Sequence, residues 1–595
     1  MADIRTGNGD TVVRLRQWLG LNESPDGDTG LKPGEASVMR NFRITREGHL
    51  QTRPGTAQVA ALAQDKPVLD IWSGELDKKN CLFAVCNDTL WSIDAENGRA
   101  TGCPFDTTSR TGYEGKFFQF EGNLYLLTGM GYYRCTADGA WQEVEGYIPT
   151  VVTAAPPEGG GTLLERVNLL TGKKKAKYSP DGTATVFQLP ESGITEVLAV
   201  EGTDIGWTAD LSKGTVTFAS PPAEGTNTLT FLWNKVSNQR AAVDNMRGWE
   251  IYNGDTDARV FLYGDGTNRC IYSGLDGDGQ PTAEYFPDMN VLAVGEANVP
   301  VTSLIRHYDR LLVFKEDSAW TVGYSTLTLE DGAVTAAFCC TPLNRQIGCA
   351  GYGQAVLVGN DPRTLHGQAV YEWTLSGSGT RDERNARRIS DRVEVTLSGF
   401  DTRACVTFDD EYEQEYYIFC GDRTLVHNYG RDAWYLYEGL SVTCARRVKG
   451  ELYFGTADGR VLHVSRRYRG DSGAPIDACW ESGAMDFDRD WRVKYTAELW
   501  LSLKPESQGR LEVTLKSNRK TQYPRKTAAA GLVTFARADF GHWSFSTNRQ
   551  AQVQRVRLKA RKVTFWKLVL ESCSATAAAT VLAADVRVRY AGNVR

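Results

Sequence analysis

The sequence predicts an all-β chain built around a β-propeller, with six or seven blades favoured. A short apolar run, a tight polar turn and a second strand recur along the chain; the apolar runs stand at residues 82–85, 124–127, 260–263, 311–314, 416–419 and 452–454. Most copies are typical of an antiparallel hairpin. The intervals include 42 and 36 residues, and four-stranded propeller blades recur at about 40–50 residues. Helical patterns are sparse throughout.

Two further β-domains are predicted outside the repeat. The interval from Leu124 to Val260 is 136 residues, which is one blade plus roughly 90 residues. The strands after the glycine run at 159–161 predict a small β-sandwich inserted in a blade loop, where insertions are best tolerated. Beyond the last hairpin, strands such as 555–560 and 586–590 alternate charged and apolar residues. That alternation predicts a terminal β-sandwich whose basic face points outward.

The chain is too long for a single hydrophobic core, which usually stops growing at about 250–300 residues. We divide it as follows: 1–56, an N-terminal arm and the first propeller strands; 57–157, the first part of the propeller; 158–236, the inserted β-sandwich; 237–469, the second part of the propeller; and 470–595, the basic C-terminal β-sandwich.

Charge is distributed unevenly along the chain. The net charge is −6, but residues 501–595 hold 18 Lys and Arg against 5 Asp and Glu. One interpretation is a surface that is solvated or docks on an acidic neighbour; the other is proximity to nucleic acid. No recognition helix or nucleic-acid motif accompanies the excess, which disfavours sequence-specific binding.

The sequence predicts no catalytic, cofactor-binding or metal-binding residue. The six histidines, at 49, 307, 366, 427, 463 and 542, have no HxH or HxxxH spacing, and His463 is more simply a blade residue than a ligand. No GxSxG turn marks a nucleophile, although a triad assembled from distant residues stays open. The glycine run at 159–161 lacks a following Lys-Ser/Thr and is interpreted as a linker rather than a phosphate cradle. The lysine run at 173–175 is interpreted as a solvated turn.

We interpret the two acidic clusters as structural features and not as catalytic or metal-binding sites. Glu411, Glu413 and Glu415 follow Asp409 and Asp410, and their alternation predicts one strand face turned to solvent or to another subunit. A retaining glycosidase needs two carboxylates about 5 Å apart, one with a raised pKa, and an exposed stripe does not supply that pair. The acidic turn at 276–279 matches half of a calcium loop but lacks the later ligand, so we expect a hairpin turn without metal.

The sequence shows neither a membrane span nor a disulfide framework. No stretch approaches about 20 apolar residues, and the first residues lack the apolar segment of a secretory signal. Thirteen cysteines occur without a CxxC pair, as expected of a chain folded in a reducing cytosol. Cys339 and Cys340 would point to opposite faces of a strand, so a shared metal is not expected.

Several motifs resemble a family of viral proteins. They stand at residues 18–22, 34–36, 39–42, 48–50 and 53–55, then at 285–288, 294–296, 308–314, 422–424 and 432–434. The first group resembles the opening of tailed-phage tail proteins, and the whole is similar to the tail-nozzle and packaged-DNA-stabilisation proteins of short-tailed phages. The likeness spans most of residues 15–470 and the start of the terminal sandwich.

The resemblance implies a structural virion protein without enzymatic activity. Its copies would form a homo-oligomeric ring, commonly a hexamer, below the portal or head–tail adaptor protein, with tail fibre or tail-tip proteins as further partners. The ring would enclose a channel for double-stranded DNA, contacted without sequence specificity. The expected location is the virion tail, after synthesis in the host bacterial cytoplasm. On this view acidic surfaces let DNA slide past, and basic surfaces serve docking between subunits.

Two alternatives remain open at this stage. The chain could be a tail-tip or baseplate protein that binds a receptor. It could also be a propeller hydrolase acting on surface glycans, because the propeller fold serves enzymes and scaffolds alike.

Overall fold

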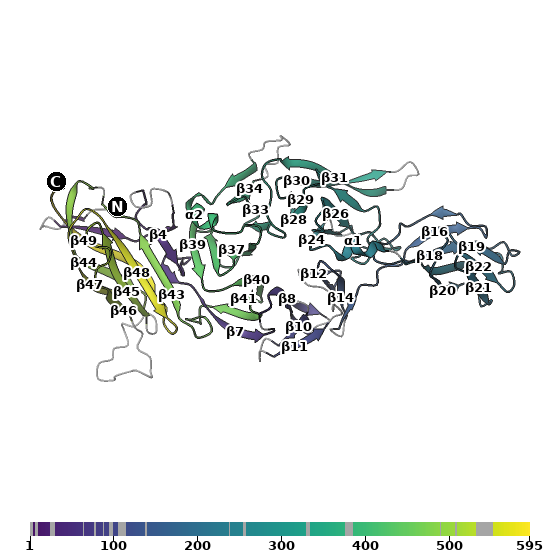
Figure 1. Ribbon diagram of the computed structural model, residues 1–595, viewed down its shortest axis with the longest axis horizontal. Helices are drawn as coiled ribbons and strands as arrows, with labels where there is room; N and C mark the ends of the chain where they lie inside the picture. Colours follow the sequence, from purple (N-terminus) through teal and green to yellow (C-terminus); the bar gives the residue numbers. More distant parts are fainter. Residues whose placement is uncertain are drawn as a thin grey trace.

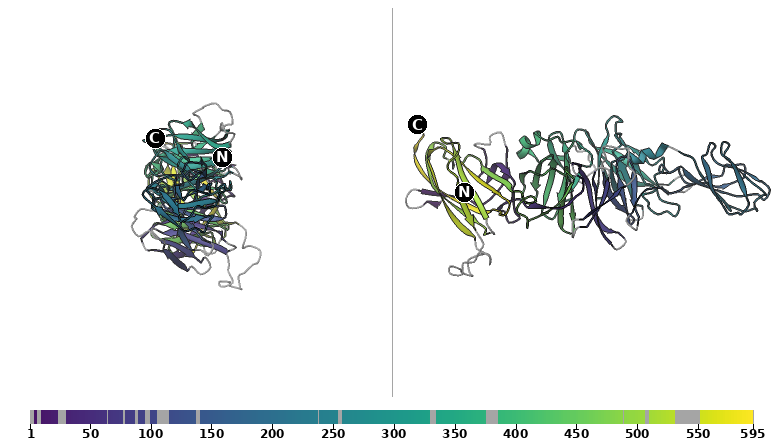
Figure 2. Two further views of the ribbon diagram at one scale, coloured as in Figure 1. Left: turned by 90° about the vertical axis from the view of Figure 1, so that its right-hand side faces the viewer. Right: turned by 60° about the horizontal axis from the view of Figure 1, so that its bottom comes forward.

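The computed structural model forms an elongated molecule of three β-domains in a row (Figures 1 and 2). It describes all residues except 1–3, 6–9, 24–29, 64, 77–78, 87–88, 95–98, 105–114, 137–139, 237, 254–256, 329–333, 375–384, 488, 506–508, 531–550 and 595. A terminal β-sandwich carries both chain ends, a β-propeller lies in the middle, and an inserted β-sandwich lies at the far end. The predicted all-β fold is confirmed. No helix among the described residues is long and apolar enough to cross a membrane.

The propeller has seven blades, each a four-stranded antiparallel sheet. Blades 1 to 4 are built from β8 (Val68–Leu76), β9 (Lys79–Cys86), β10 (Thr89–Ile93) and β11 (Ala100–Pro104); β12 (Lys116–Phe120), β13 (Asn123–Leu127), β14 (Tyr132–Cys135) and β15 (Trp141–Glu143); β24 (Gly248–Tyr252), β25 (Arg259–Tyr263), β26 (Arg269–Tyr272) and β27 (Val291–Ala293); and β28 (Val301–His307), β29 (Arg310–Lys315), β30 (Ala319–Thr328) and β31 (Val334–Asn344).

Blades 5 to 7 follow the same pattern. They contain β32 (Val356–Val358), β33 (Asp361–His366), β34 (Ala369–Trp373) and β35 (Ala386–Arg388); β36 (Val406–Asp410), β37 (Glu415–Cys420), β38 (Arg423–Asn428) and β39 (Ala433–Glu438); and β40 (Val442–Val448), β41 (Glu451–Thr456), β42 (Arg460–Ser465) and β7 (Gly55–Ala61). Short helices α1 (Ala241–Asp244) and α2 (Glu394–Ser398) lie in connections between blades.

The apolar runs seen in the sequence form the buried middle strands of the blades. In β25, Val260 to Leu262 have no exposed surface, and Leu311 to Phe314 of β29 are equally buried. Their side chains pack between neighbouring blades; one core joins blades 2 and 3, and another joins blades 3 and 4. Burial of this apolar surface between sheets is the main force that holds the blades together.

The ring of blades is closed by a strand from the start of the chain. β7 supplies the fourth strand of blade 7 and pairs antiparallel with β42, with Arg460 opposite Ala61 and Ser465 opposite Gly55. Val461 of blade 7 then shares a core with Ile71 of blade 1. Closure leaves only short, protected strand edges, which is how propellers avoid open sheets.

The inserted domain lies between blades 2 and 3 and has its own core. One sheet contains β16 (Thr150–Ala155), β17 (Thr162–Leu163), β18 (Lys173–Tyr178), β20 (Glu196–Glu201) and β23 (Leu229–Asn234); the other contains β19 (Val186–Gln188), β21 (Trp207–Asp210) and β22 (Thr215–Phe218). Tyr178, Phe187, Phe231 and Trp233 meet between the two sheets with no exposed surface.

Local expectations for this domain need correction. It begins at Thr150 rather than at residue 158, because β16 pairs in parallel with β18. The glycine run at 159–161 is therefore not a linker; it forms the turn between β16 and β17, with φ of 91° to 93°. The lysine run at 173–175 is not a turn either, since it opens β18 and pairs with β23. Long-range pairing decides these positions, whereas local composition does not.

The terminal domain is a sandwich that recruits the N-terminal residues. One sheet has the order β1 (Ile4–Arg5), β2 (Asp10–Leu15), β49 (Thr580–Asn593), β44 (Arg492–Leu503) and β47 (Gln552–Val563), with β5 (Phe42–Ile44) and β6 (Leu50–Thr52) beside β49. The other sheet runs through β4 (Glu35–Arg40), β43 (Ile476–Ser482), β48 (Trp566–Ser574), β45 (Gly509–Ser517) and β46 (Lys526–Ala530), and β3 (Gly20–Leu21) pairs with β4. Residues 1–56 are thus mainly sandwich strands, not the arm and propeller strands expected.

One sheet crosses the boundary between propeller and sandwich. β4 pairs in parallel with β39 of blade 6, with Leu436 opposite Arg40, and in antiparallel fashion with β43. Blade 6 and the second sandwich sheet are therefore a single ten-stranded sheet. The two domains are therefore joined by backbone pairing at their junction.

Candidate functional site

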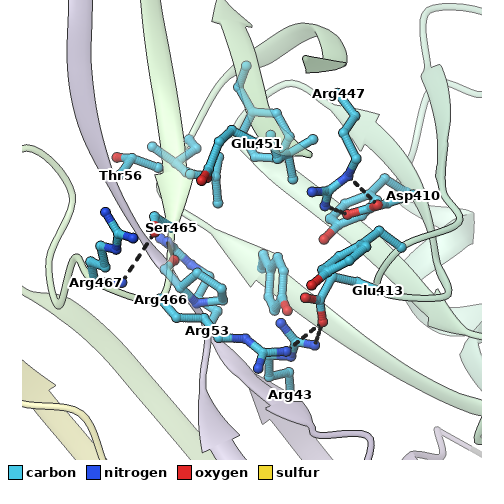
Figure 3. Close-up of a pocket in the computed structure, with 18 of the residues that line it drawn as sticks. Arg43, Arg53, Thr56, Asp410, Glu413, Arg447, Glu451, Ser465, Arg466 and Arg467 are labelled. Carbon is cyan, nitrogen blue, oxygen red and sulfur yellow. Dashed lines mark hydrogen bonds and ion pairs between the residues drawn. The ribbon is translucent and has the colours of Figure 1, made fainter. Parts of the chain in front are cut away.

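A cavity of about 310 Å³ lies where the N-terminal segment meets blades 6 and 7 (Figure 3). Arg43 and Arg53 reach it from the N-terminal segment, and Glu413 from the turn between β36 and β37. Figure 3 shows Arg447 reaching Asp410 on one side of the cavity and Arg43 reaching Glu413 on another. The size falls within the range of small-molecule sites, so the chemistry of the lining decides what the cavity can do.

A buried ion cluster forms one wall of this cavity. The Arg43 guanidinium lies 2.7 Å from a Glu413 oxygen and 3.1 Å from a Glu415 oxygen, and the side chains of Arg43 and Glu415 are 2% and 0% exposed. The Tyr417 hydroxyl donates to Glu415 at 2.5 Å, and the Tyr435 hydroxyl donates to the same carboxylate. Buried charges of this kind persist only when they are paired and hydrogen-bonded.

The pKa of Glu413 reports this pairing. Burial alone would raise the pKa of the Glu413 carboxyl, but the guanidinium groups of Arg43 and Arg466 outweigh burial and hold it below its ordinary value. Arg466 lies 2.7 Å from the same oxygen. Glu413 is therefore a held anion, and it is not poised to exchange protons near neutral pH.

The expected acidic stripe is wrong as a solvent-facing or subunit-facing feature. Residues 411–414 form the tight turn between β36 and β37, with φ of +58° at Gln414. Only Glu411 of the three glutamates is exposed, whereas Glu413 and Glu415 point into the junction. Their partner Arg43 lies some 370 residues earlier in the chain. Local alternation therefore could not reveal that the stripe is buried.

Two further arginines tie the N-terminal segment and blade 7 to this region. Arg53 binds Asp471 through both terminal nitrogens, at 2.9 and 2.5 Å, and donates to the Asn41 side chain at 2.9 Å. Arg447 donates through Nε to Asp410 at 2.8 Å. The motif at 53–55 flagged Arg53 in the sequence, but only as part of a resemblance. Arg43 carried no signal beyond its place between the apolar residues at 42 and 44.

The carboxylates that line the cavity are already engaged. Glu451 accepts from His463 Nε2 at 2.8 Å, and Asp410 and Glu413 hold arginines as described. His463 also contacts the Tyr468 hydroxyl at 3.2 Å. This lining offers no free pair of carboxylates for acid–base chemistry of the glycosidase kind. The geometry instead fixes the N-terminal segment against two blades.

Two carboxyls elsewhere in the propeller have unusual pKa values. Burial raises the pKa of Asp409, on β36, to about 7, with the Glu411 charge adding to the effect. Burial also raises the pKa of Glu250, on β24, to about 7. Both belong to the first strand of a blade, and the first strands of neighbouring blades, such as β36 and β40, contact one another. Raised pKa values attend catalytic acids and buried structural acids alike.

The other sequence candidates occupy separate, structural positions. His427 stacks on Trp434 with ring centroids 4.4 Å apart, and burial lowers its pKa. The Asp276 carboxylate accepts backbone N–H groups of Asp278 and Gln280 at 3.0 and 2.8 Å, as in a capped turn. His542 lies outside the described residues. Within the described part of the chain, no group of three or more His, Cys, Asp or Glu is arranged to hold a metal ion.

Comparisons with known proteins return generic propellers. No family model matches the sequence, and no curated protein matches it. Among solved structures, the chain is similar to the AfRom2 CNH domain (7% identity, 69% of this chain and 98% of that chain, TM-score 0.33). It is also similar to the WD40 domain of SCAP from fission yeast (8%, 72% and 98%, TM-score 0.28). A third similar structure is an exo-β-1,3-galactanase from Phanerochaete chrysosporium (10% identity, 81% of this chain and 97% of that chain, TM-score 0.17). None of these likenesses carries an argument about function.

Proposed function

We propose that the chain is a structural protein of a bacteriophage tail, whose copies form a ring or nozzle below the portal or head–tail adaptor. The ring, a hexamer in the form that the sequence resemblance favours, would enclose the channel that retains and releases the genome. It would be made in the host cytoplasm and reside in the virion tail. Tail fibre or tail-tip proteins are its further partners.

The junction between propeller and sandwich is the observation that supports this proposal most. A shared ten-stranded sheet and a buried ion cluster fix the two domains relative to each other. A subunit that forms part of a channel wall has to keep its shape while DNA moves past it. A molecule whose propeller and terminal sandwich share one sheet suits that task.

The proposal assigns no catalytic residue. Arginines hold Asp410 and Glu413 of the junction cavity, and His463 donates to Glu451. The contact between Arg43 and Glu413 joins segments that lie far apart in the sequence. An enzyme of the propeller type would instead keep some of these groups free to contact substrate.

The oligomeric state tests the proposal. The purified full-length chain is measured by light scattering coupled to size exclusion, alone and with the portal or adaptor protein of the same virus. We expect a closed ring under at least one condition, visible as a ring in negative-stain images. A strict monomer under both conditions refutes the ring.

The inserted sandwich supports a second candidate, a tail-tip protein that binds a receptor. This domain lies at the end of the molecule opposite the chain termini (Figure 2). It also exposes two apolar side chains beside its first strand, Leu163 and Leu164, 79% and 61% accessible. Particle images with a label on the inserted sandwich separate the candidates, because a position in the collar supports the nozzle and a distal position supports the receptor-binding protein.

A further inference from the structure

The outer face of the terminal sandwich is strongly basic. In the sheet formed by β2, β49, β44 and β47, one face packs in the core and the other faces outward. On β47, Val556, Leu558 and Ala560 are buried, while the residues between and beside them are exposed basic residues. This is the basic face that the sequence predicted for residues 470–595.

Strand register arranges the outward side chains in rows. Trp500 of β44 lies opposite Arg555 on β47 and Asp585 on β49; we call this the first row. The second row has Glu498 between Arg557 and Arg587. Directly opposed residues on neighbouring strands are close enough for their side chains to interact.

The third row completes the pattern. Tyr495 of β44 lies between Arg561 on β47 and Arg589 on β49. Tyr495, Glu498 and Trp500 are partly buried and form a central column on β44. Arginines flank this column on both sides, except that the flanking residue on β49 in the first row is Asp585.

Two acidic residues of this face, Glu498 and Asp10, are already paired with arginines, which leaves part of the positive charge uncompensated. Glu498 holds Arg555, and Asp10 lies 2.7 Å from Nε of Arg587. Asp10 also lies 3.5 Å from Arg589. The unmatched charges are Arg557, Lys559 and Arg561, which are exposed and form no ion pair among the described residues. All three stand on β47, at the edge of the sheet.

We propose that this face docks on the acidic propeller of a second copy of the chain. The inference rests on the proposed ring and names one surface that would build it. The propeller segments, 57–149 and 237–469, hold 45 Asp and Glu against 31 Lys and Arg. Oppositely charged surfaces on one chain attract in a head-to-tail manner. A head-to-tail interface closes into a ring when the rotation between copies allows it.

The composition of the face favours a protein partner over DNA. Trp, Tyr and Arg are the residues enriched in the hot spots of protein–protein interfaces, and the central column offers Trp500 and Tyr495 between arginines. Asp585 and the arginine-paired Glu498 interrupt the positive charge in the middle of the same face. A surface that binds DNA through its backbone would present Lys and Arg without such interruptions.

Charge reversal on the sheet edge tests the proposal. The variant replaces Arg557, Lys559 and Arg561 with Glu; all three side chains are exposed, so we expect the fold to be kept. The matched control replaces Lys175, Lys177 and Lys213 of the inserted sandwich with Glu and changes the net charge equally. Sedimentation velocity measures assembly at about 50 mM and about 300 mM salt, because salt shortens the reach of exposed charges.

The expected result is specific to the β47 variant. We expect its assembly to weaken by about 100-fold, because like charges placed across an interface repel. The control should assemble like the wild type, and high salt should weaken wild-type assembly. Carbodiimide cross-linking of mixed ¹⁴N and ¹⁵N protein should join Lys559 or Lys562 of one copy to propeller carboxylates of the other.

Other outcomes would overturn the inference in distinguishable ways. If wild type and β47 variant form the same ring with equal affinity, the ring stands and this face is not its interface. If the variant instead loses affinity for a duplex of about 30 base pairs while its assembly is unchanged, the face binds DNA. Links from Lys559 that reach only the partner's terminal sandwich exclude the propeller as the docking site. A wild-type protein that never assembles refutes the ring and the interface together.

Discussion

Removing the Arg43 guanidinium should loosen the junction between propeller and sandwich. Arg43 is 2% exposed and neutralises two carboxylates, at 2.7 and 3.1 Å, one of which is fully buried. In Arg43→Ala the fully buried Glu415 carboxylate loses its cation inside the protein, whereas Glu413 keeps Arg466. Breaking a buried ion pair by removing one partner costs about 3–5 kcal/mol. That is a large share of the roughly 5–15 kcal/mol that stabilises a typical domain.

Hydrogen exchange measured by mass spectrometry on the peptide over residues 411–420 is the suitable assay, because a chain of several domains does not unfold in a single step. We expect exchange in this peptide to accelerate by roughly 10²–10³-fold, since each 1.4 kcal/mol of local opening energy is about tenfold.

Two further variants sharpen this measurement. Arg46→Ala removes an exposed arginine that stacks on Tyr412, with the guanidinium carbon 5.1 Å from the ring centroid, and should leave exchange nearly unchanged. Arg43→Lys keeps the charge and should fall between wild type and Arg43→Ala. An Arg43→Ala protein whose peptide exchanges within about threefold of wild type would refute the argument that Arg43 holds these carboxylates in place.

The remaining predictions concern pH, a tight turn and a buried lysine. The pKa of Asp409 is raised to about 7 in the folded protein, above the value of about 4 expected in the unfolded chain. The folded state should therefore lose stability as pH rises from about 4 to about 7. Melting temperatures measured over this pH range should decline less in Asp409→Asn than in the wild type. Gly459→Ala would place Cβ 1.7 Å from the Ala63 carbonyl oxygen and should lower the melting temperature far more than Gly439→Ala, which has a similar positive φ but open space; equal effects would contradict the clash. Lys494 Nζ donates to three backbone carbonyls at 2.6–3.0 Å. Lys494→Met should therefore destabilise the sandwich locally by about 3 kcal/mol, measured by hydrogen exchange in the peptide that contains residue 494. A loss below about 0.5 kcal/mol would contradict the contribution assigned to these hydrogen bonds.

Local patterns in the sequence predicted many of the strands correctly. The run at 260–263 predicted a buried strand beside a turn, and it is β25, because apolar runs and turn residues act over a few positions. The strands at 555–560 and 586–590 likewise alternate as expected in β47 and β49. Buried strands, turns and alternating strands depend on neighbouring residues, so they can be predicted from a single sequence.

The junction site could not be predicted from the sequence, because it depends on residues that are distant in the chain. Glu413 and Glu415 look like part of an exposed stripe until Arg43, far away in the sequence, is placed beside them. The lysine run at 173–175 looks like a turn until β23 pairs with it. Strand partners and ion partners that lie tens to hundreds of residues apart leave no periodic pattern in the sequence. Sequence patterns therefore predicted the blades but not the contacts that join them.

The pairing of the first strands with the last also sets the order in which this chain can mature during synthesis. β7 pairs with β42, β4 with β43, and β2 with β49. At ribosomal speeds of about 5–20 residues per second, the partner of β2 emerges roughly 30–120 s after β2 itself. The earliest residues made are therefore among the last to reach their native place. Until then they are unpaired strands, open to proteases, chaperones and neighbouring nascent chains, and a ribosome that stops early leaves the terminal sandwich unfinished.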